Sequence, residues 1–120
     1  MQKLLIVDDE QDIREFAKSF FKKRGIDVFT ASGGKKALEI IGNENPDLVL
    51  LDVQMEEMTG IDVLKSLRES GKDTKVIMVT GAEEESIVVK AREYGVREYV
   101  HKPLVLEELE KIVMMELGVA

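Results

Sequence analysis

The sequence predicts an α/β fold built on a single, doubly wound sheet of five parallel strands. Short aliphatic runs alternate five times with segments whose apolar residues recur at helical spacing. Three of these runs are almost entirely apolar, as expected for strands covered by helices on both faces. Parallel strands require long crossover connections, and the intervening helical segments supply them.

The five predicted strands are short, and turn residues separate them from the segments around them. Asn45, Pro46 and Asp47, for example, form a turn before the third strand. In chain order the predicted strands are Lys3–Val7, Ile26–Thr30, Leu48–Leu51, Val76–Thr80 and Glu98–His101.

The five predicted helices each carry an apolar stripe at intervals of three and four residues. Gly25, Gly71 and Gly95 each follow a helical segment, where glycine readily takes the left-handed conformation that ends a helix. In chain order the stripes are Ile13, Phe16, Ala17 and Phe20; Leu38 and Ile41; Ile61, Leu64 and Leu67; Ile87, Ala91 and Tyr94; and Leu106, Leu109 and Val113.

The length and composition are those of one domain, and we expect residues 1–120 to form it. The chain has 120 residues, of which 44% are hydrophobic and 34% are charged, enough for one core. The absence of cysteine excludes disulfides and thiolate metal sites, and it fits a cytoplasmic protein. The net charge of −7 argues against a nucleic-acid surface, and no apolar run is long enough to cross a membrane.

Residues that can carry chemistry occur where the predicted strands end. Parallel strands end at the same edge of a sheet, so these residues are expected to lie together. Each has an ordinary structural explanation alone: Asp8 with Gln11, for instance, resembles a helix capping box. Their joint occurrence is harder to explain by chance. Asp8 and Asp9 follow the first strand, Asp52 the third and Lys102 the fifth, and Thr80 ends the fourth.

The three aspartates are the unusual part of this edge, because clustered carboxylates repel one another unless they take up protons or bind a cation. With no cysteine and a single histidine, the expected cation is a hard one that prefers oxygen ligands, such as Mg²⁺. A nearby lysine and a threonine hydroxyl suit a phosphoryl group. The pattern therefore predicts a site of phosphoryl transfer, in which a carboxylate can itself be the nucleophile.

Taken together, these motifs resemble the response-regulator receiver domain of two-component signalling. The resemblance covers essentially the whole chain and rests on IVDDE, LVLLD, VQMEEMTG, VIMVTGA and the HKP step. It implies the strand order 2-1-3-4-5, which flavodoxin and CheY share. It fits both a stand-alone receiver and the receiver of a longer chain.

The resemblance also implies how the phosphoryl group is held. Asp52 would be the phosphoacceptor, and Lys102 would bridge Asp52 and the phosphoryl group. The hydroxyl of Thr80 would donate a hydrogen bond to that group once it arrives. The backbone N–H groups of Gln54 and Gly81 would be further donors to it.

The same resemblance implies a metal site beside the phosphoacceptor. Mg²⁺, with Mn²⁺ as a substitute, would be bound by Asp9, Asp52 and the backbone carbonyl of Gln54, and by Asp8 through a water molecule. The peptide bond before Pro103 would be cis.

Partners and a switch are implied as well. The phosphoryl group would come from a phosphohistidine on a sensor histidine kinase or a histidine phosphotransfer protein. Thr80 would move toward it and Tyr99 would rotate inward behind Thr80. This would change the face of the fourth helix, the fifth strand and the fifth helix, so that the chain signals by protein contact or by phosphorelay. The chain would catalyse only its own phosphorylation and dephosphorylation.

Two positions depart from the pattern of the family. Glu56 follows Met55 where the family usually has proline, so the loop after the phosphoacceptor loses a fixed φ and gains a charge. Leu104 follows Lys102 and Pro103 where the family prefers phenylalanine, which reduces the apolar volume there.

Three other functions compete with phosphoacceptance. A phosphorylation-independent interaction module usually lacks one of the key groups, and all five are present here. A Mg²⁺-dependent phosphatase with an aspartyl intermediate would want a second aspartate where Gln54 stands. A flavin binder would want a Ser/Thr/Gly loop after the first strand and more aromatic residues than 5% of the chain.

Overall fold

The computed structural model describes residues 2–81 and 85–119, and it confirms the predicted alternation of strands and helices. Three strands differ from the prediction by one residue, at one end or at both ends. The second begins and ends one residue later because Asp27 pairs with Lys3. The strands are β1 (Lys3–Val7), β2 (Asp27–Ala31), β3 (Leu48–Asp52), β4 (Lys75–Thr80) and β5 (Glu98–His101).

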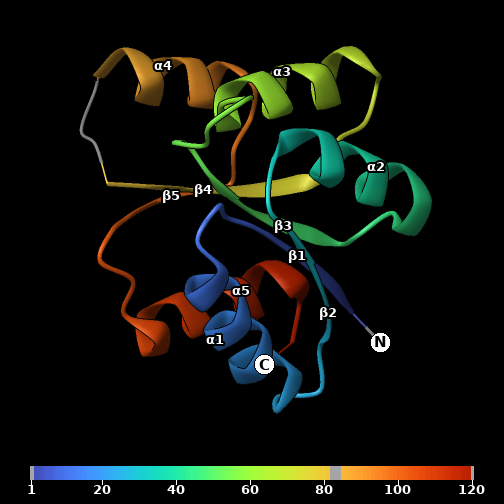
Figure 1. The fold of residues 1–120 in the computed structure, drawn as a ribbon, viewed down its shortest axis with the longest axis vertical. Coiled ribbons are helices and arrows are strands. Elements are labelled where there is room, and N and C mark those ends of the chain that lie inside the picture. Colours follow the sequence, from blue (N-terminus) through green and yellow to red (C-terminus); the bar gives the residue numbers. More distant parts are fainter. Residues whose placement is uncertain (1, 82–84, 120) are drawn as a thin grey trace.

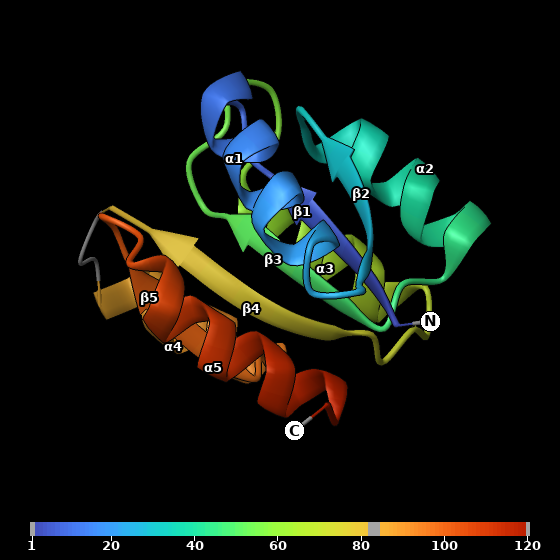
Figure 2. The ribbon, with the colours of Figure 1, turned by 90° about the horizontal axis from the view of Figure 1, so that it is seen from below.

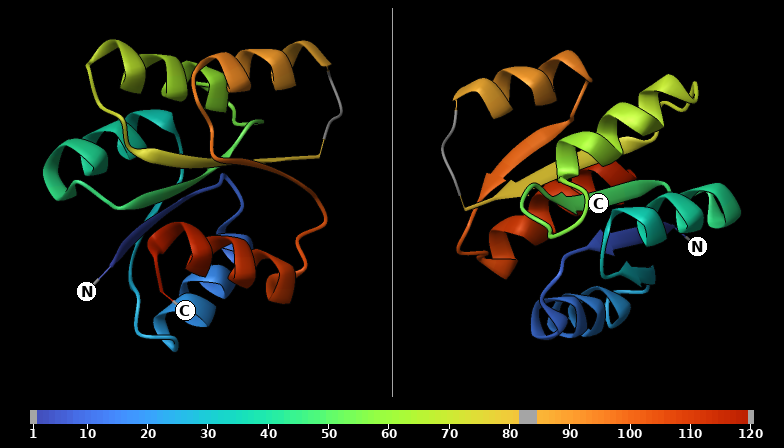
Figure 3. Two further views of the ribbon diagram at one scale, coloured as in Figure 1. Left: turned by 180° about the vertical axis from the view of Figure 1, so that it is seen from behind. Right: turned by 45° about the horizontal axis from the view of Figure 1, so that its top comes forward.

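Five helices connect and follow these strands, and they cover both faces of the sheet. Figure 1 shows α2, α3 and α4 above the sheet and α1 and α5 below it, and Figures 2 and 3 show the same two layers from below and from behind. The helices are α1 (Gln11–Lys22), α2 (Gly34–Glu44), α3 (Gly60–Glu69), α4 (Glu85–Glu93) and α5 (Leu106–Leu117). Among the described residues, none of them is long and apolar enough to span a membrane.

The sheet is parallel throughout and has the expected order, β2-β1-β3-β4-β5. β1 and β3 are therefore neighbours at the point where the winding direction reverses, which is where open α/β sheets bind ligands. Val7 pairs with Leu51, so the next residues of the two strands, Asp8 and Asp52, come side by side at the carboxyl edge.

Side-chain alternation along the strands divides the core into two layers. Leu5 and Val7 pack with residues of α2, α3 and α4, whereas Leu4 and Ile6 pack with residues of α1 and α5. Because β1 is covered on both sides, four of its five residues are buried. This explains the unbroken apolar run that precedes the acidic residues, and it makes β1 a rigid support for them.

The start of α1 corrects one prediction. Asp8 and Gln11 do not form a capping box, because the residue before the helix is Glu10 and its side chain makes no capping hydrogen bond. Asp8 instead accepts a hydrogen bond from the backbone N–H of Glu10, at 2.8 Å. A capping box does occur at α3, where Thr59 and Asp62 each bind the other's backbone N–H.

The apolar stripe of α1 also differs from the prediction. Ala17 and Phe21 are buried, but Phe16 is 67% exposed. Phe21 fills the core beneath the sheet and turns the helix so that Phe16 faces outward. The three glycines predicted to end helices behave as expected: Gly25, Gly71 and Gly95 have φ angles of 80°, 85° and 74°.

Candidate functional site

The carboxyl edge of the sheet holds the polar groups that are buried in the described part of the chain. Asp8 is 3% exposed, Asp52 2% and Thr80 0%. Burying a carboxylate is costly unless it is paired or hydrogen-bonded. These side chains end three adjacent strands of the sheet, so their burial marks one site rather than three separate exceptions.

Lys102 brings the two buried carboxylates together. Its Nζ lies 3.2 Å from Oδ2 of Asp52 and 3.5 Å from Oδ2 of Asp8. The alternation of β3 explains the direction of Asp52, since Leu48 and Leu50 face α1 and α5 and Asp52 continues that series. The other oxygen of Asp52 accepts a hydrogen bond from the backbone N–H of Gln54, at 3.2 Å. One ammonium is thus shared between two carboxylates.

The pKa values of these groups reflect a shortage of positive charge. Burial, and then the neighbouring Asp8 carboxylate, raise the pKa of Asp52 above its ordinary 3.8, although Lys102 and the Gln54 N–H act in the opposite direction. Burial lowers the pKa of Lys102, but Asp52 and Asp8 outweigh that effect and raise it above 10.5. A further cation at this edge would relieve both shifts.

The acidic residues after β1 supply oxygen ligands for such a cation. Asp9 and Glu10 are exposed beside the buried Asp8, and one carboxylate oxygen from each of the three lies within 4.8 Å of the others. The donors are all oxygen atoms, and the buried pair of carboxylates is only partly neutralised by Lys102. The residues present therefore fit a hard divalent cation.

The loop between β3 and α3 is held closely despite the glutamate at position 56. Gly60 donates its N–H to the carbonyl of Val53 at 2.9 Å, and a side chain added at Gly60 would place its Cβ 2.4 Å from the backbone oxygen of Asp52. A Cβ at Gly34 would lie 2.6 Å from Sδ of Met58. These close contacts fix the loop where the family uses proline.

Thr80, Gly81 and Tyr99 occupy the β4–β5 side of the edge. Gly81 is exposed and lines a surface pocket together with Lys102. Tyr99 lies opposite Met78 and packs against the core layer that contains residues of α2, α3 and α4. Among the residues that the structure describes, its Oη is the one buried side-chain polar atom without a hydrogen-bond partner. The Lys102–Pro103 peptide bond is cis.

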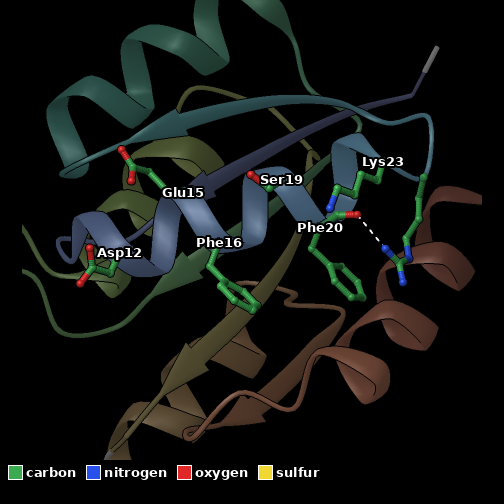
Figure 4. A pocket seen from close by; sticks show the side chains of 7 residues that line it. Asp12, Glu15, Phe16, Ser19, Phe20 and Lys23 are labelled. Atoms are coloured by element: carbon green, nitrogen blue, oxygen red, sulfur yellow. Dashed lines mark hydrogen bonds between the residues drawn. The ribbon is translucent and has the colours of Figure 1, made fainter.

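Two features of α1 near this site were not predicted from the sequence: a contact of Arg14, and the outward direction of Phe16 and Phe20. Arg14 donates from Nη1 to the backbone oxygen of Asp8, at 2.7 Å. Phe16 and Phe20 project from the same side of α1 beside a surface pocket (Figure 4). Phe16 also lines the neighbouring pocket that reaches Gly81 and Lys102. Helical spacing cannot separate an exposed phenylalanine from a buried one, and it carries no signal for a contact between a side chain and a distant carbonyl.

Two comparisons of sequence place these features in a family. The family model for the response regulator receiver domain matches residues 4–114. The chain is 38% identical to the regulatory protein AtoC of Escherichia coli over 117 residues, which are 98% of this chain and 25% of AtoC. It is 36% identical to the sporulation initiation phosphotransferase F of Bacillus subtilis over 112 residues, 93% of this chain and 90% of that protein.

Solved structures agree with the fold. The receiver domain of the Francisella response regulator 1452 has a TM-score of 0.91 and 31% identity, with 98% of both chains covered. The response regulator TrrA of Thermotoga maritima, in complex with Mg²⁺–BeF, has a TM-score of 0.85 and 33% identity over 97% of this chain and 99% of TrrA. The chain spans nearly all of these proteins, but only a quarter of AtoC.

Proposed function

Because the chain belongs to the response regulator receiver domain family, we propose that it accepts a phosphoryl group on Asp52 from a phosphohistidine donor. Receiver domains are signalling modules rather than enzymes with a separate substrate. One observation carries the proposal. The Asp52 carboxylate is 2% exposed at the centre of the carboxyl edge, and Lys102 and Asp8 lie beside it.

The transfer is a displacement at phosphorus. One oxygen of Asp52 forms the new P–O bond as the P–N bond to the donor imidazole breaks, and the electron pair of that bond returns to the imidazole. Lys102, at 3.2 Å from Oδ2 of Asp52, balances the charge that moves onto the phosphoryl group. The N–H groups of Gln54 and Gly81 and the Thr80 hydroxyl then donate to the phosphoryl oxygens.

Mg²⁺, or Mn²⁺ in its place, would offset the negative charge of the carboxylates and phosphoryl oxygens when bound. We propose that Asp9, Asp52 and the backbone carbonyl of Gln54 hold it directly, and that Asp8 holds it through water. The carboxylate oxygens gathered at Asp8, Asp9 and Glu10, and the raised pKa of Asp52 caused by burial and by Asp8, support a cation at this edge. So does the complex of the related TrrA with Mg²⁺–BeF.

Phosphorylation is proposed to switch the face formed by α4, β5 and α5. Thr80 turns toward the phosphoryl group, and Tyr99 fills the space behind it. The buried Tyr99 hydroxyl supports this role. A buried donor without a hydrogen-bond partner is unfavourable, so a second conformation in which the hydroxyl is paired would be favoured. A downstream protein then reads this face, or the phosphoryl group passes to another histidine protein. We place the chain, as one receiver over residues 1–120, in the cytoplasm.

The experiment is labelling with radioactive acetyl phosphate and Mg²⁺. The wild type should acquire an acid-labile label, Asp52→Asn should not, and Asp73→Asn, which changes an exposed aspartate, should label as the wild type does. A wild type that stays unlabelled, or an Asp52→Asn variant that labels equally well, would show that the chain does not accept a phosphoryl group on Asp52. It would then be an interaction module on the same fold.

The donor is proposed to be a sensor histidine kinase or a histidine phosphotransfer protein that docks over Phe16. This side chain is 67% exposed and lines the pocket that leads to Lys102, so a partner seated there reaches Asp52. Phe16→Ala should slow transfer from a phosphohistidine protein but leave labelling by acetyl phosphate unchanged. Met115→Ala, at a residue 66% exposed on α5, is the matched control. Equal effects of Phe16→Ala on both donors would contradict docking there.

A further inference from the structure

We propose that Arg14 is a positioning residue for the cation side of the site. It holds the peptide group between Asp8 and Asp9, and thereby presents both carboxylates to the cation together. The inference rests on the proposed function, because it concerns the cation that phosphoryl transfer at Asp52 would use. It assigns a role to a residue of α1 that contacts neither the cation nor the phosphoryl group.

The contact itself is short and specific. Nη1 of Arg14 donates to the backbone oxygen of Asp8 at 2.7 Å, and the side chain is half-buried. A guanidinium stays charged at all relevant pH values, so the hydrogen bond is charge-assisted and stronger than a neutral one. The carbonyl it holds belongs to the peptide bond that joins Asp8 to Asp9. Fixing that peptide plane restricts the direction in which the Asp9 side chain leaves the backbone.

Arg14 completes a set of bonds around Asp8. The N–H of Asp8 donates to the carbonyl of Ala31 at 3.2 Å, Oδ1 accepts from the N–H of Glu10 at 2.8 Å, and Oδ2 faces Lys102 at 3.5 Å. Without Arg14, the carbonyl would lose the partner that ties the turn after β1 to the body of α1. The backbone carbonyl is therefore the one of these polar groups of Asp8 whose hydrogen bond depends on Arg14.

The mounting of Arg14 makes the restraint rigid. Ala17 lies one helical turn further along α1 and is 3% exposed, and Phe21 is fully buried, so this helix is anchored in the core. A group on an anchored helix holds a ligand more precisely than one on a loop. The restraint thus connects the core beneath the sheet to the turn that carries the acidic residues.

Arg14 has two effects of opposite sign on cation binding. Its positive charge repels a cation, and its hydrogen bond orders the ligands. The geometry favours the second effect. The guanidinium points at a carbonyl rather than a carboxylate, and solvent reaches its half-buried side chain and screens the charge. The order it imposes acts on Asp8 and Asp9 together, and residues that orient metal ligands typically change metal affinity about 10- to 100-fold when replaced.

The test is calorimetric titration of the whole chain with Mg²⁺. Arg14→Gln should weaken Mg²⁺ binding about tenfold. Arg14→Lys, which keeps a charge and one donor, should recover part of the affinity. The matched control is Arg24→Gln. Arg24 lies beyond the last residue of α1, far from the acidic residues after β1, and it also donates to a backbone carbonyl, that of Phe20 at 2.9 Å. This variant should bind Mg²⁺ as the wild type does.

A second readout separates positioning from a general loss of structure. In Arg14→Gln, the Mg²⁺ concentration that gives half the maximal rate of labelling should rise, and the rate at saturating Mg²⁺ should stay near that of the wild type. Unchanged or tighter Mg²⁺ binding by Arg14→Gln overturns the positioning role even when the wild type labels on Asp52. A wild type that binds no Mg²⁺ and takes no label overturns the proposed function instead.

Discussion

Individual residues of the site are held in a balance of charge that is incomplete without a cation. Asp8 and Asp52 are buried, and among the described residues Lys102 is the ammonium that lies between them. Such an arrangement reduces the stability of the cation-free protein, and it would favour the divalent cation that we propose for this site. Two substitutions at this scale change the balance in opposite directions.

Asp52→Asn should stabilise the Mg²⁺-free protein by about 1 kcal/mol, because it removes one of two buried carboxylates and leaves Lys102 paired with Asp8. Urea unfolding at neutral pH in the presence of a chelator measures this free energy. Glu39→Gln, at an exposed position of α2, is the control and should change it by no more than a few tenths. A clear loss of stability in Asp52→Asn would show that the carboxylate is already well compensated.

The effect of Asp52 should also depend on pH. Burial and Asp8 raise its folded-state pKa above 3.8, so the folded protein holds this proton more tightly than the unfolded chain does. The contribution of Asp52 to the free energy of unfolding therefore falls as pH rises from 3.8 through the raised value, opposite to an ordinary salt-bridged carboxylate. The difference in stability between Asp52→Asn and wild type should grow across that window, and a constant difference would contradict the raised pKa.

Lys102→Met should destabilise the Mg²⁺-free protein by about 3 kcal/mol, because it leaves both carboxylates buried without a cation. Lys111→Met, at an exposed position of α5, should have little effect in the same unfolding measurement.

The contribution of Lys102 should also depend on pH. Asp52 and Asp8 overcome the effect of burial and raise the pKa of Lys102 above 10.5. The stabilisation that Lys102 provides is therefore complete below pH 10.5, and it is lost as pH rises through the folded-state pKa. A neutral result for Lys102→Met would mean that the carboxylates are protonated.

Among the elements, the segment from β3 to α3 positions Asp52, the proposed phosphoacceptor. Gly60 begins α3 directly against the backbone of Asp52, with its N–H bonded to the carbonyl of Val53. Glycine is required there by the close approach of two backbones and not by its φ angle. This packing restrains the loop that carries Glu56.

Gly60→Ala should destabilise the protein by about 2 kcal/mol, because its Cβ would lie 2.4 Å from the Asp52 oxygen and the end of β3 must move. Labelling by acetyl phosphate should slow as well. The control is Gly42→Ala in α2, where a Cβ meets nothing within 4 Å and alanine should stabilise the helix by about 0.5–1 kcal/mol. Thermal unfolding and labelling rates compare the two, and equal effects would contradict the close contact.

The elements also show where prediction from sequence succeeds. β1 and β3 could be located because both faces of each strand are buried and their residues are almost all apolar. The orientation of α1 could not, because Phe16 and Phe21 are equally apolar and only packing selects which one is buried. At the site, Asp52 and Lys102 were predictable from strand ends. The carbonyl contact of Arg14 depends on tertiary geometry that no periodic pattern records.

For the whole molecule, the proposed cation site would couple cation binding to stability. Mg²⁺ held there as proposed would bind the folded chain, where the acidic residues are gathered, far better than the unfolded one. At a concentration 100 times its dissociation constant it should therefore raise the free energy of unfolding by about 2.7 kcal/mol. Asp9→Asn, which removes an exposed ligand, should show a smaller gain in the same unfolding series. Equal gains would mean that Asp9 does not hold the ion.

The central claim is that the molecule accepts one phosphoryl group on one carboxylate, that of Asp52. Mass spectrometry of the wild type after treatment with acetyl phosphate and Mg²⁺, followed by peptide mapping, tests it most directly. The account predicts the added mass of a single phosphoryl group, located on the peptide that contains Asp52 and removed by mild acid or base. A phosphoryl group on another residue, or none on a folded protein that binds Mg²⁺, would contradict it.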